Sequence, residues 1–269
     1  MSAHEKMRLS LLWSLLLTLL TSCIHPREQS ANVIAEKDAR KSGAEFMSAQ
    51  NQALQRDDNA NPAMLWVKDG EAQWSRKAGA ADKSCADCHA AAQSMRGVAV
   101  RYPAFDEASN APVNLQQRIE ICRVKHQRAA PLAFESQPLL NLESYVALQS
   151  RGMPLMPPID ARLATARANG KARYMQRIGQ LDLACTQCHD RHAGGKLGGS
   201  TIPEAHPTAY PLYRLEWQAL GSLQRRLRNC MTGVRAEPYA LGSAELVELE
   251  LYLHERAAGM KSEAPGVRP

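Results

Sequence analysis

The chain has 269 residues, of which 45% are hydrophobic and only 5% aromatic, and its 33 basic and 27 acidic side chains give a net charge of +6. This length suffices for one large or two small domains, and a bound cofactor would supply the apolar bulk that aromatic residues usually provide. The basic residues are dispersed among acidic ones and form no long run, which argues against nucleic-acid binding.

The first 23 residues have the pattern of a cleaved signal peptide. Lys6 and Arg8 precede the apolar run LLWSLLLTLL, and small residues lead to Cys23. The run is too short and too close to the N-terminus for a permanent membrane span. The segment LTSC also resembles a bacterial lipobox, so a plain secretory signal and a lipoprotein signal both stay open. Both predict a periplasmic protein, which reaches the membrane only if Cys23 is lipidated.

Two CxxCH motifs follow an N-terminal extension over residues 24–73. In this motif the two thiols form thioethers with the vinyl groups of a haem, and the histidine reaches the iron from the same turn. Two copies in an exported, aromatic-poor chain predict two covalently bound haem c groups, against a zinc or thioredoxin-like site as the alternative. The attachment cysteines are Cys85, Cys88, Cys185 and Cys188, and the iron ligands are His89 and His189.

A single cysteine follows each motif at the end of a short basic segment. LQQRIEIC ends at Cys122 and LQRRLRNC ends at Cys230, and each segment is predicted to form a helix. A terminal amphipathic helix comes next in both cases; in the second, Ser243 is the expected N-cap of a helix running to about Ala258. Between the two stretches, three prolines in RGMPLMPPID prevent a continuous helix, and residues 161–178 supply the helix that leads into the second motif.

These features repeat along the chain. The CxxCH motifs begin 100 residues apart, and the lone cysteines lie 108 apart; Glu143, Tyr145, Gly152 and Met153 recur 107 residues later as Glu250, Tyr252, Gly259 and Met260. The repeat predicts a mainly α fold of two tandem cytochrome c-like domains, residues 74–155 with haem 1 and residues 156–269 with haem 2 and the active site.

Three roles compete for the lone cysteines. Cys122 and Cys230 can form a disulfide with each other, which export favours, or each can be the second iron ligand of one haem. Met153 and Met260 are rival ligands, but they follow the terminal helix, whereas domains that resemble class I cytochrome c present this ligand before it. The histidines His126 and His206 are weaker rivals. The position in the repeat therefore favours cysteine ligation of both irons.

The motifs resemble those of SoxA, the dihaem subunit of the SoxAX complex in bacterial thiosulfate oxidation. The similarity lies in RIGQLDLACTQCHD, in TAYPLYRLEWQALGSLQRRLRNCMTGVRAEPY, and in CADCH, IEICRVKH and ALQSRGMPL of the first half. The resemblance implies an L-cysteine S-thiosulfotransferase that acts with the cytochrome SoxX. It joins thiosulfate to a cysteine of the carrier protein SoxYZ and passes electrons to haem.

The resemblance also implies residue roles. Cys122 belongs to haem 1 and Cys230 to haem 2, where Cys230 carries an extra sulfur as a persulfide and is catalytic, and Arg226 binds substrate. Arg226 lies one helical turn before Cys230, and its planar guanidinium suits an oxyanion. Arg225, Arg228 and Arg235 are candidates by proximity alone.

The repeat does not rank the two cysteines, because Arg118 holds the same place before Cys122. Gly233 and Glu237 after Cys230 suit an approachable site, but the ranking depends mainly on the resemblance. Two other functions stay open: a dihaem electron carrier without a substrate site, and a thiosulfate dehydrogenase that needs no carrier protein.

Overall fold

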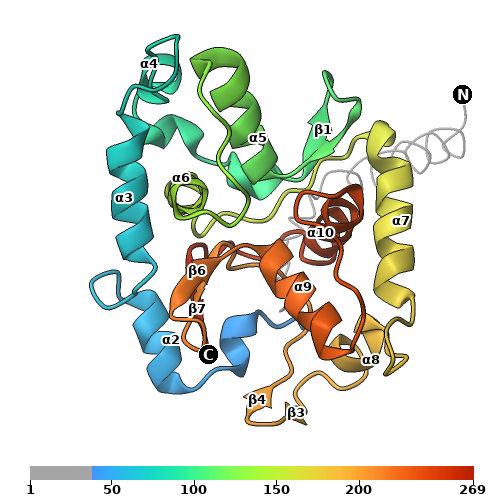
Figure 1. Ribbon diagram of the computed structural model, residues 1–269. Coiled ribbons are helices and arrows are strands. Elements are labelled where there is room, and N and C mark those ends of the chain that lie inside the picture. Colours follow the sequence, from blue (N-terminus) through green and yellow to red (C-terminus); the bar gives the residue numbers. More distant parts are fainter. Residues whose placement is uncertain (1–37) are drawn as a thin grey trace, which may run out of the picture. The chain divides into compact units, whose positions relative to one another are not determined.

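The computed structural model describes residues 38–269, so the predictions for the signal peptide, Cys23 and residues 24–37 lie outside the described residues. Residues Arg40–Pro269 form one compact unit (Figure 1). The unit is mainly helical, as predicted, and none of the helices in its described residues is long and apolar enough to cross a membrane.

The elements follow one another as short helices and still shorter strands. The α-helices are α2 (Ala49–Arg56), α3 (Met64–Trp74), α4 (Ala86–His89), α5 (Leu115–Cys122), α6 (Gln137–Leu148), α7 (Ala164–Met175), α8 (Cys185–His189), α9 (Leu223–Gly233) and α10 (Ala244–Arg256). The strands are β1 (Ala104–Asp106), β2 (Ala111–Val113), β3 (Lys196–Leu197), β4 (Ser200–Thr201), β5 (Leu212–Arg214), β6 (Ala219–Gly221) and β7 (Gly266–Arg268). Single turns η1 (Gly43–Phe46), η2 (Ala92–Met95), η3 (Ala99–Arg101), η4 (Arg123–Gln127) and η5 (Ala161–Leu163) join them.

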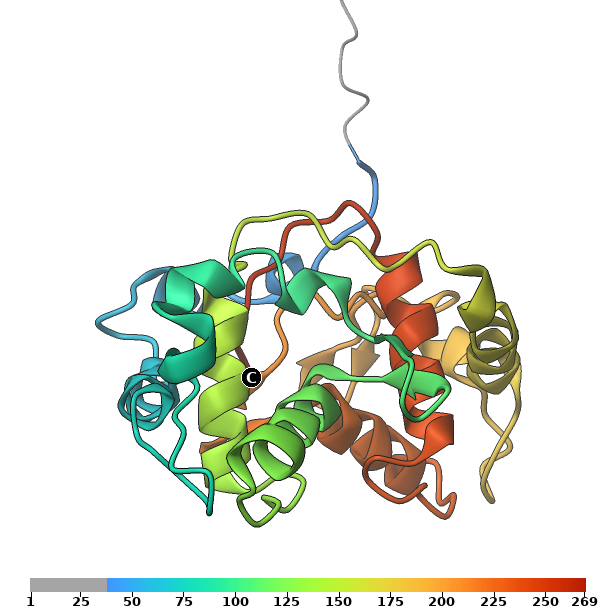
Figure 2. The same cartoon turned by 90° about the horizontal axis from the view of Figure 1, so that it is seen from above.

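Two pairs of crossing helices form the frame. Helix α3 packs on α6, and α7 packs on α10; the two pairs lie on opposite sides of the unit (Figures 1 and 2). A glycine stands at each crossing: a methyl group on Gly70 would collide with the backbone carbonyl of Asn141, and one on Gly170 with that of Glu248. The close backbone approach therefore requires glycine in both α3 and α7.

The repeat seen in the sequence is confirmed by matching local structure. The antiparallel hairpins β1–β2 and β5–β6 lie 108 residues apart, and each leads into a helix with a polar N-cap. The Asn114 side chain caps α5 by accepting from the Gln117 N–H, and the Ser222 side chain caps α9 by accepting from the Arg225 N–H. The hairpins were not predicted, because their three-residue strands lack a clear alternation of apolar and polar residues.

The predicted helix bounds are close to those observed. Ser243 caps α10 as expected, through its side chain and the Leu246 N–H, and the helix ends at Arg256. Helix α5 ends at Cys122 and continues as the π-helical turn η4, whereas α9 runs past Cys230 to Gly233. Residues 154–160 form the predicted break between the halves.

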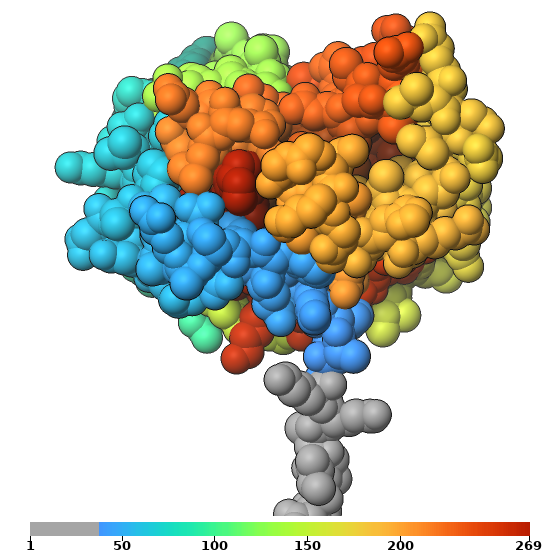
Figure 3. Space-filling model, turned by 90° about the horizontal axis from the view of Figure 1, so that it is seen from below, coloured from blue at the N-terminus to red at the C-terminus, as the bar shows by residue number. Residues whose placement is uncertain are grey.

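The two halves share their cores. Val100 and Leu155 pack with Ala257 and Met260, and Leu140 packs with Leu220. Strand β7 pairs in parallel with β5, so the sheet order is β6-β5-β7, and its Val267 N–H donates to Gln55 Oε1 of α2 at 2.9 Å. Figure 3 shows the first residues of the unit running beside its last residues. The domain limits 74–155 and 156–269 stay a prediction within this single unit.

The junction of the two halves contains three buried or partly buried carboxyl groups, those of Glu135, Glu143 and Glu250. The charge of Glu135 raises the pKa of both Glu143 and Glu250. Glu250 is only 5% exposed and accepts hydrogen bonds from Asn114 Nδ2 at 2.9 Å and Gln224 Nε2 at 3.3 Å. Burial raises the pKa of Glu250 to about 7 against these hydrogen bonds, because a charged carboxylate is poorly solvated there.

This raised pKa makes stability dependent on pH. The folded state holds the Glu250 proton up to about pH 7, whereas the unfolded chain releases it near 4.5, so the free energy of unfolding falls as pH rises between these values. Glu250→Gln keeps the carbonyl acceptor and removes the titration. Between pH 5 and pH 8, the melting temperature of the wild type should fall by roughly 5 °C more than that of E250Q.

Thermal unfolding followed by circular dichroism would measure this difference. Glu71→Gln, on the exposed face of α3, is the control and should keep the wild-type slope. Parallel pH profiles for the wild type and E250Q would contradict the role of Glu250.

Candidate active site

His189, Arg226 and Cys230 meet in the second half of the unit. Helix α8 carries His189, whose Nδ1 lies 2.7 Å from the Pro203 carbonyl oxygen and donates to it. Arg226 and Cys230 stand one turn apart on α9. Burial would raise the pKa of the Cys230 thiol, but His189 and Arg226 together outweigh this effect, so the pKa lies below its ordinary value. The site therefore favours a thiolate.

These three side chains line a cavity of about 430 Å³. Its apolar wall includes Leu223 and Leu227 of α9 and Leu253 of α10. Further lining residues come from the first turn of the unit, from the segment between α8 and β5, from β5 itself and from the last strand; they include Phe46, Lys196, Thr201, His206, Tyr210, Arg214 and Arg268.

The first CxxCH motif assembles a similar set of side chains. Cys122 lies close enough to the motif that its charge raises the pKa of Cys85, and that of Cys88 raises the pKa of Cys122. The Trp74 ring packs beside the His89 ring, with centroids 5.9 Å apart. Unlike that of Cys230, the pKa of Cys122 is raised, because burial outweighs the nearby positive charge. The two lone cysteines therefore differ in their electrostatic surroundings.

The arginines before the two cysteines also differ. Arg118 Nη1 lies 3.1 Å from Asp106 Oδ1, which neutralises its charge. No carboxylate in the described part of the chain lies within ion-pair distance of Arg226. The sequence repeat gave no difference between these two arginines, but the structure does: Arg118 is paired with a carboxylate and Arg226 is not, among the described residues.

The donor sets fit c-type haem. Each offers two thiols on one short helix for covalent attachment, an imidazole at the end of that helix, and a thiol from a second helix. In the second half, the Pro203 contact at Nδ1 directs the other ring nitrogen of His189 to ligation, as is usual for metal-binding histidines. All six described cysteines are free, so a disulfide between Cys122 and Cys230 is not formed.

An insertion distinguishes the second half. The CxxCH motifs are offset by 100 residues, but Tyr102-Pro103 and Tyr210-Pro211 are offset by 108, so eight extra residues lie between His189 and Tyr210. This segment contains the β3–β4 hairpin, whose Lys196, Ser200 and Thr201 line the cavity. The difference between the two offsets predicted an insertion, but the sequence did not predict that the inserted segment lines the same cavity as Cys230.

The remaining candidate arginines lie elsewhere. Arg225 and Arg228 line a separate groove of about 300 Å³ with Asn229 and Thr232, on the other side of α9 from the cavity. Arg235 follows α9 with a φ of 58°, and its carbonyl accepts from the Gln180 N–H. Glu237 does not line the Cys230 cavity.

The rival ligands are also placed. Met153 and Met260 pack together in an apolar cluster with Val100 and Leu155, which contains no residue of either CxxCH motif. His126 is exposed on η4. His206 lines the cavity, but its Nδ1 lies 2.9 Å from the Lys41 carbonyl oxygen.

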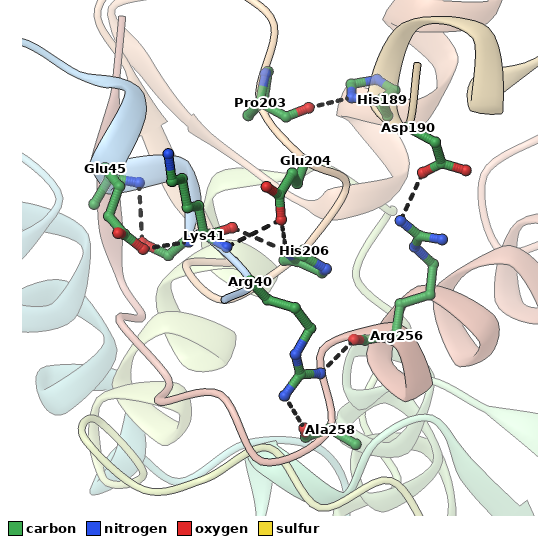
Figure 4. A network of polar contacts seen from close by, with 12 residues as sticks. Arg40, Lys41, Glu45, His189, Asp190, Pro203, Glu204, His206, Arg256 and Ala258 are labelled. Atoms are coloured by element: carbon green, nitrogen blue, oxygen red, sulfur yellow. Dashed lines mark hydrogen bonds and ion pairs between the residues drawn. The ribbon is translucent and has the colours of Figure 1, made fainter. Parts of the chain in front are cut away.

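A polar network holds the segment around His189 (Figure 4). Asp190 accepts from Arg256 Nη2 and from the Tyr174 hydroxyl, both at 2.7 Å. Glu204 accepts from the Lys41 backbone N–H at 3.0 Å, and Arg40 donates to the carbonyl oxygens of Arg256 and Ala258. The first residues of the unit thus fix the loop whose Pro203 orients His189.

The fold and these donor sets define a c-type cytochrome, in which haem is attached covalently through cysteine thiols. The sequence model of the family described as SoxA/TsdA, cytochrome c domain, matches residues 69–155 and 169–262. The chain belongs to this family, and within it to the SoxA proteins.

Several relatives carry the name L-cysteine S-thiosulfotransferase subunit SoxA. The protein of Pseudaminobacter salicylatoxidans is 36% identical over 86% of this chain and 82% of its own length. That of Rhodovulum sulfidophilum is 33% identical over 86% of this chain and 81% of its own length. The crystal structure of SoxXA from P. pantotrophus matches with a TM-score of 0.83 and 31% identity, over 86% of this chain and 87% of that chain.

Proposed function

We propose that this chain is the SoxA subunit of an L-cysteine S-thiosulfotransferase, which joins thiosulfate oxidatively to a cysteine thiol of the carrier protein SoxYZ. The observation that carries the proposal is one cavity lined by His189 of a CxxCH motif, by Cys230 with its lowered pKa, and by Arg226, which has no ion-pair partner within residues 38–269. The names of the relatives support the same activity, and the likeness to a SoxXA structure supports SoxX as the partner subunit.

Two haem c groups are held by equivalent residues in the two halves. Haem 1 is attached to Cys85 and Cys88, with His89 and Cys122 as iron ligands; haem 2 is attached to Cys185 and Cys188, with His189 and Cys230 as iron ligands. When bound, the haems accept electrons one at a time. The lowered pKa of Cys230 suits ligation, because the thiolate is the form that binds metal.

The overall reaction joins two sulfur atoms and releases two electrons. The carrier thiol and thiosulfate form a new S–S bond to give R–S–S–SO3⁻, in which R–S is the carrier cysteine; the thiol proton leaves, and bound c-type haem would take up the two electrons. Arg226 holds the dianion by its sulfonate oxygens, because a guanidinium can bind two oxyanion oxygens at once.

Cys230 works as a persulfide. Its outer sulfur forms an S–S bond with the sulfane sulfur of thiosulfate as two electrons leave. The carrier thiolate then attacks that sulfane sulfur, and the Cys230 persulfide departs unchanged.

The chain acts in the periplasm after removal of its signal peptide. If the signal ends in a lipobox, cleavage falls before Cys23, and a lipid on that residue would anchor the mature protein to the membrane. Covalent haem attachment through CxxCH suits an exported protein.

Mass spectrometry of the mature protein tests the cofactor count and the modification. The intact mass should exceed that of the polypeptide by two haems, and the peptide with Cys230 should carry one extra sulfur atom. Cys185→Ala with Cys188→Ala should lose one haem and keep the other. The Cys122 peptide, without an extra sulfur, is the internal control. An unmodified Cys230 in active protein would contradict the persulfide.

Kinetics test the anion-binding role of Arg226. Arg226→Gln should raise the KM for thiosulfate roughly 10- to 100-fold, because a charge-assisted hydrogen bond contributes about 1.5–3 kcal/mol. Reduction of SoxX in the presence of SoxYZ and varied thiosulfate would measure it.

Arg118→Gln is the matched control, since it removes the equivalent arginine beside Cys122, and it should leave the KM unchanged. Arg226→Lys should retain part of the affinity. Equal effects of R226Q and R118Q would count against Cys230 as the substrate site. Thiosulfate oxidation at the full rate without SoxYZ would instead point to a thiosulfate dehydrogenase.

A further inference from the structure

At one position of the repeat, the two halves carry side chains of opposite charge. Strands β1 and β5 correspond with an offset of 108 residues, and their last residues are Asp106 and Arg214. The same offset relates Arg118 to Arg226 and Cys122 to Cys230. A carboxylate in the first half thus corresponds to a guanidinium in the second. Asp106 pairs with Arg118, and Arg214 lines the same cavity as Arg226.

In the first half this position closes the site to anions. Asp106 is buried and accepts from the Ser109 N–H and hydroxyl, both at 2.9 Å, as well as pairing with Arg118. These hydrogen bonds lower the pKa of Asp106, so it stays charged. Arg118 is therefore already neutralised, and a second anion beside it would be repelled.

In the second half the same position adds positive charge. Arg214 is only 8% exposed and lines the cavity together with Arg226 and Cys230. Its Nη2 lies 2.8 Å from Glu216 Oε2, and its guanidinium stands 5.3 Å from the Trp217 ring. Near Cys230, the guanidiniums of Arg214 and Arg226 thus stand against a single glutamate carboxylate, that of Glu216.

One hydrogen-bond donor of Arg214 also lacks a partner. Its Nε is buried and has no acceptor among the described residues. A buried charged donor without an acceptor costs free energy unless a ligand supplies one. The Glu216 side chain is 51% exposed, so it screens Arg214 less completely than buried Asp106 screens Arg118.

We propose that Arg214 is a second anion-binding residue of this site, which grips the sulfonate group of thiosulfate together with Arg226. The inference rests on the function proposed above and adds a determinant of specificity. Arg214 stands where the first half has the carboxylate of Asp106. The Cys230 site therefore accepts a dianion, whereas the Cys122 site does not. Two guanidiniums select the thiosulfate dianion over singly charged thiolates and hydrosulfide.

Binding and kinetics of Arg214→Gln test this role. The oxidised holoprotein in complex with SoxX should bind thiosulfate roughly tenfold or more weakly in calorimetry without SoxYZ. With SoxYZ, the KM for thiosulfate should rise by a similar factor while kcat changes less than about twofold. Arg214→Lys should recover part of the affinity.

Arg228→Gln is the matched control, because it removes the same charge from the opposite side of α9 and should leave both constants unchanged. Glu216→Gln is a second, independent variant at a half-exposed position. It releases Arg214 from its carboxylate and should tighten thiosulfate binding several-fold, so it decides the question if R214Q fails to fold.

Three results would overturn the inference. Unchanged affinity in R214Q or E216Q, with normal binding by the wild type, would show that Arg214 does not touch the anion. A shifted haem spectrum or midpoint potential in R214Q with an unchanged KM would show that Arg214 serves the haem instead. A wild type that neither binds nor oxidises thiosulfate would sink the proposed function itself, and the Arg214 role with it.

Discussion

The close contact between crossing helices is the constraint on which both halves depend. In each half a glycine lets the backbone of one helix touch that of the other, Gly70 against Asn141 and Gly170 against Glu248. The first helix of each pair leads directly into a CxxCH motif, so the crossing fixes where the thiols and the imidazole stand. A larger residue at either glycine would separate the helices and displace these donors.

The two halves share this helix packing but differ in a few residues around the lone cysteine. A hairpin and a capped helix bring a cysteine to each CxxCH motif in the same way. The differences are an eight-residue insertion that lines one cavity and the sign of the charge at the end of β1 and β5. A duplicated framework can thus hold two cysteine sites with different electrostatic surroundings, because the charges near the lone cysteine vary independently of the helix packing.

The local features of this fold were predictable from the sequence, and the non-local ones were not. The CxxCH motifs, the Ser243 cap and the proline break are set within a few residues, so their patterns suffice. The helical spacing of Arg226 and Cys230 also placed them on one face. The side of α9 that Arg225 and Arg228 occupy, by contrast, depends on how that helix packs. Arg214 was not predicted as a site residue, because its equivalence to Asp106 is seen only when β5 is aligned with β1. The 108-residue offset between the lone cysteines would have given that alignment.

The pairing of β7 with β5 and of Val267 with Gln55 has a consequence for how the molecule folds. The latter contact joins residues 212 positions apart, so it cannot form until nearly the whole chain is available. Contacts of such high sequence separation slow folding, because a long loop must close before they form. The sheet β6-β5-β7 is therefore completed only after the residues of both CxxCH motifs are already present in the chain.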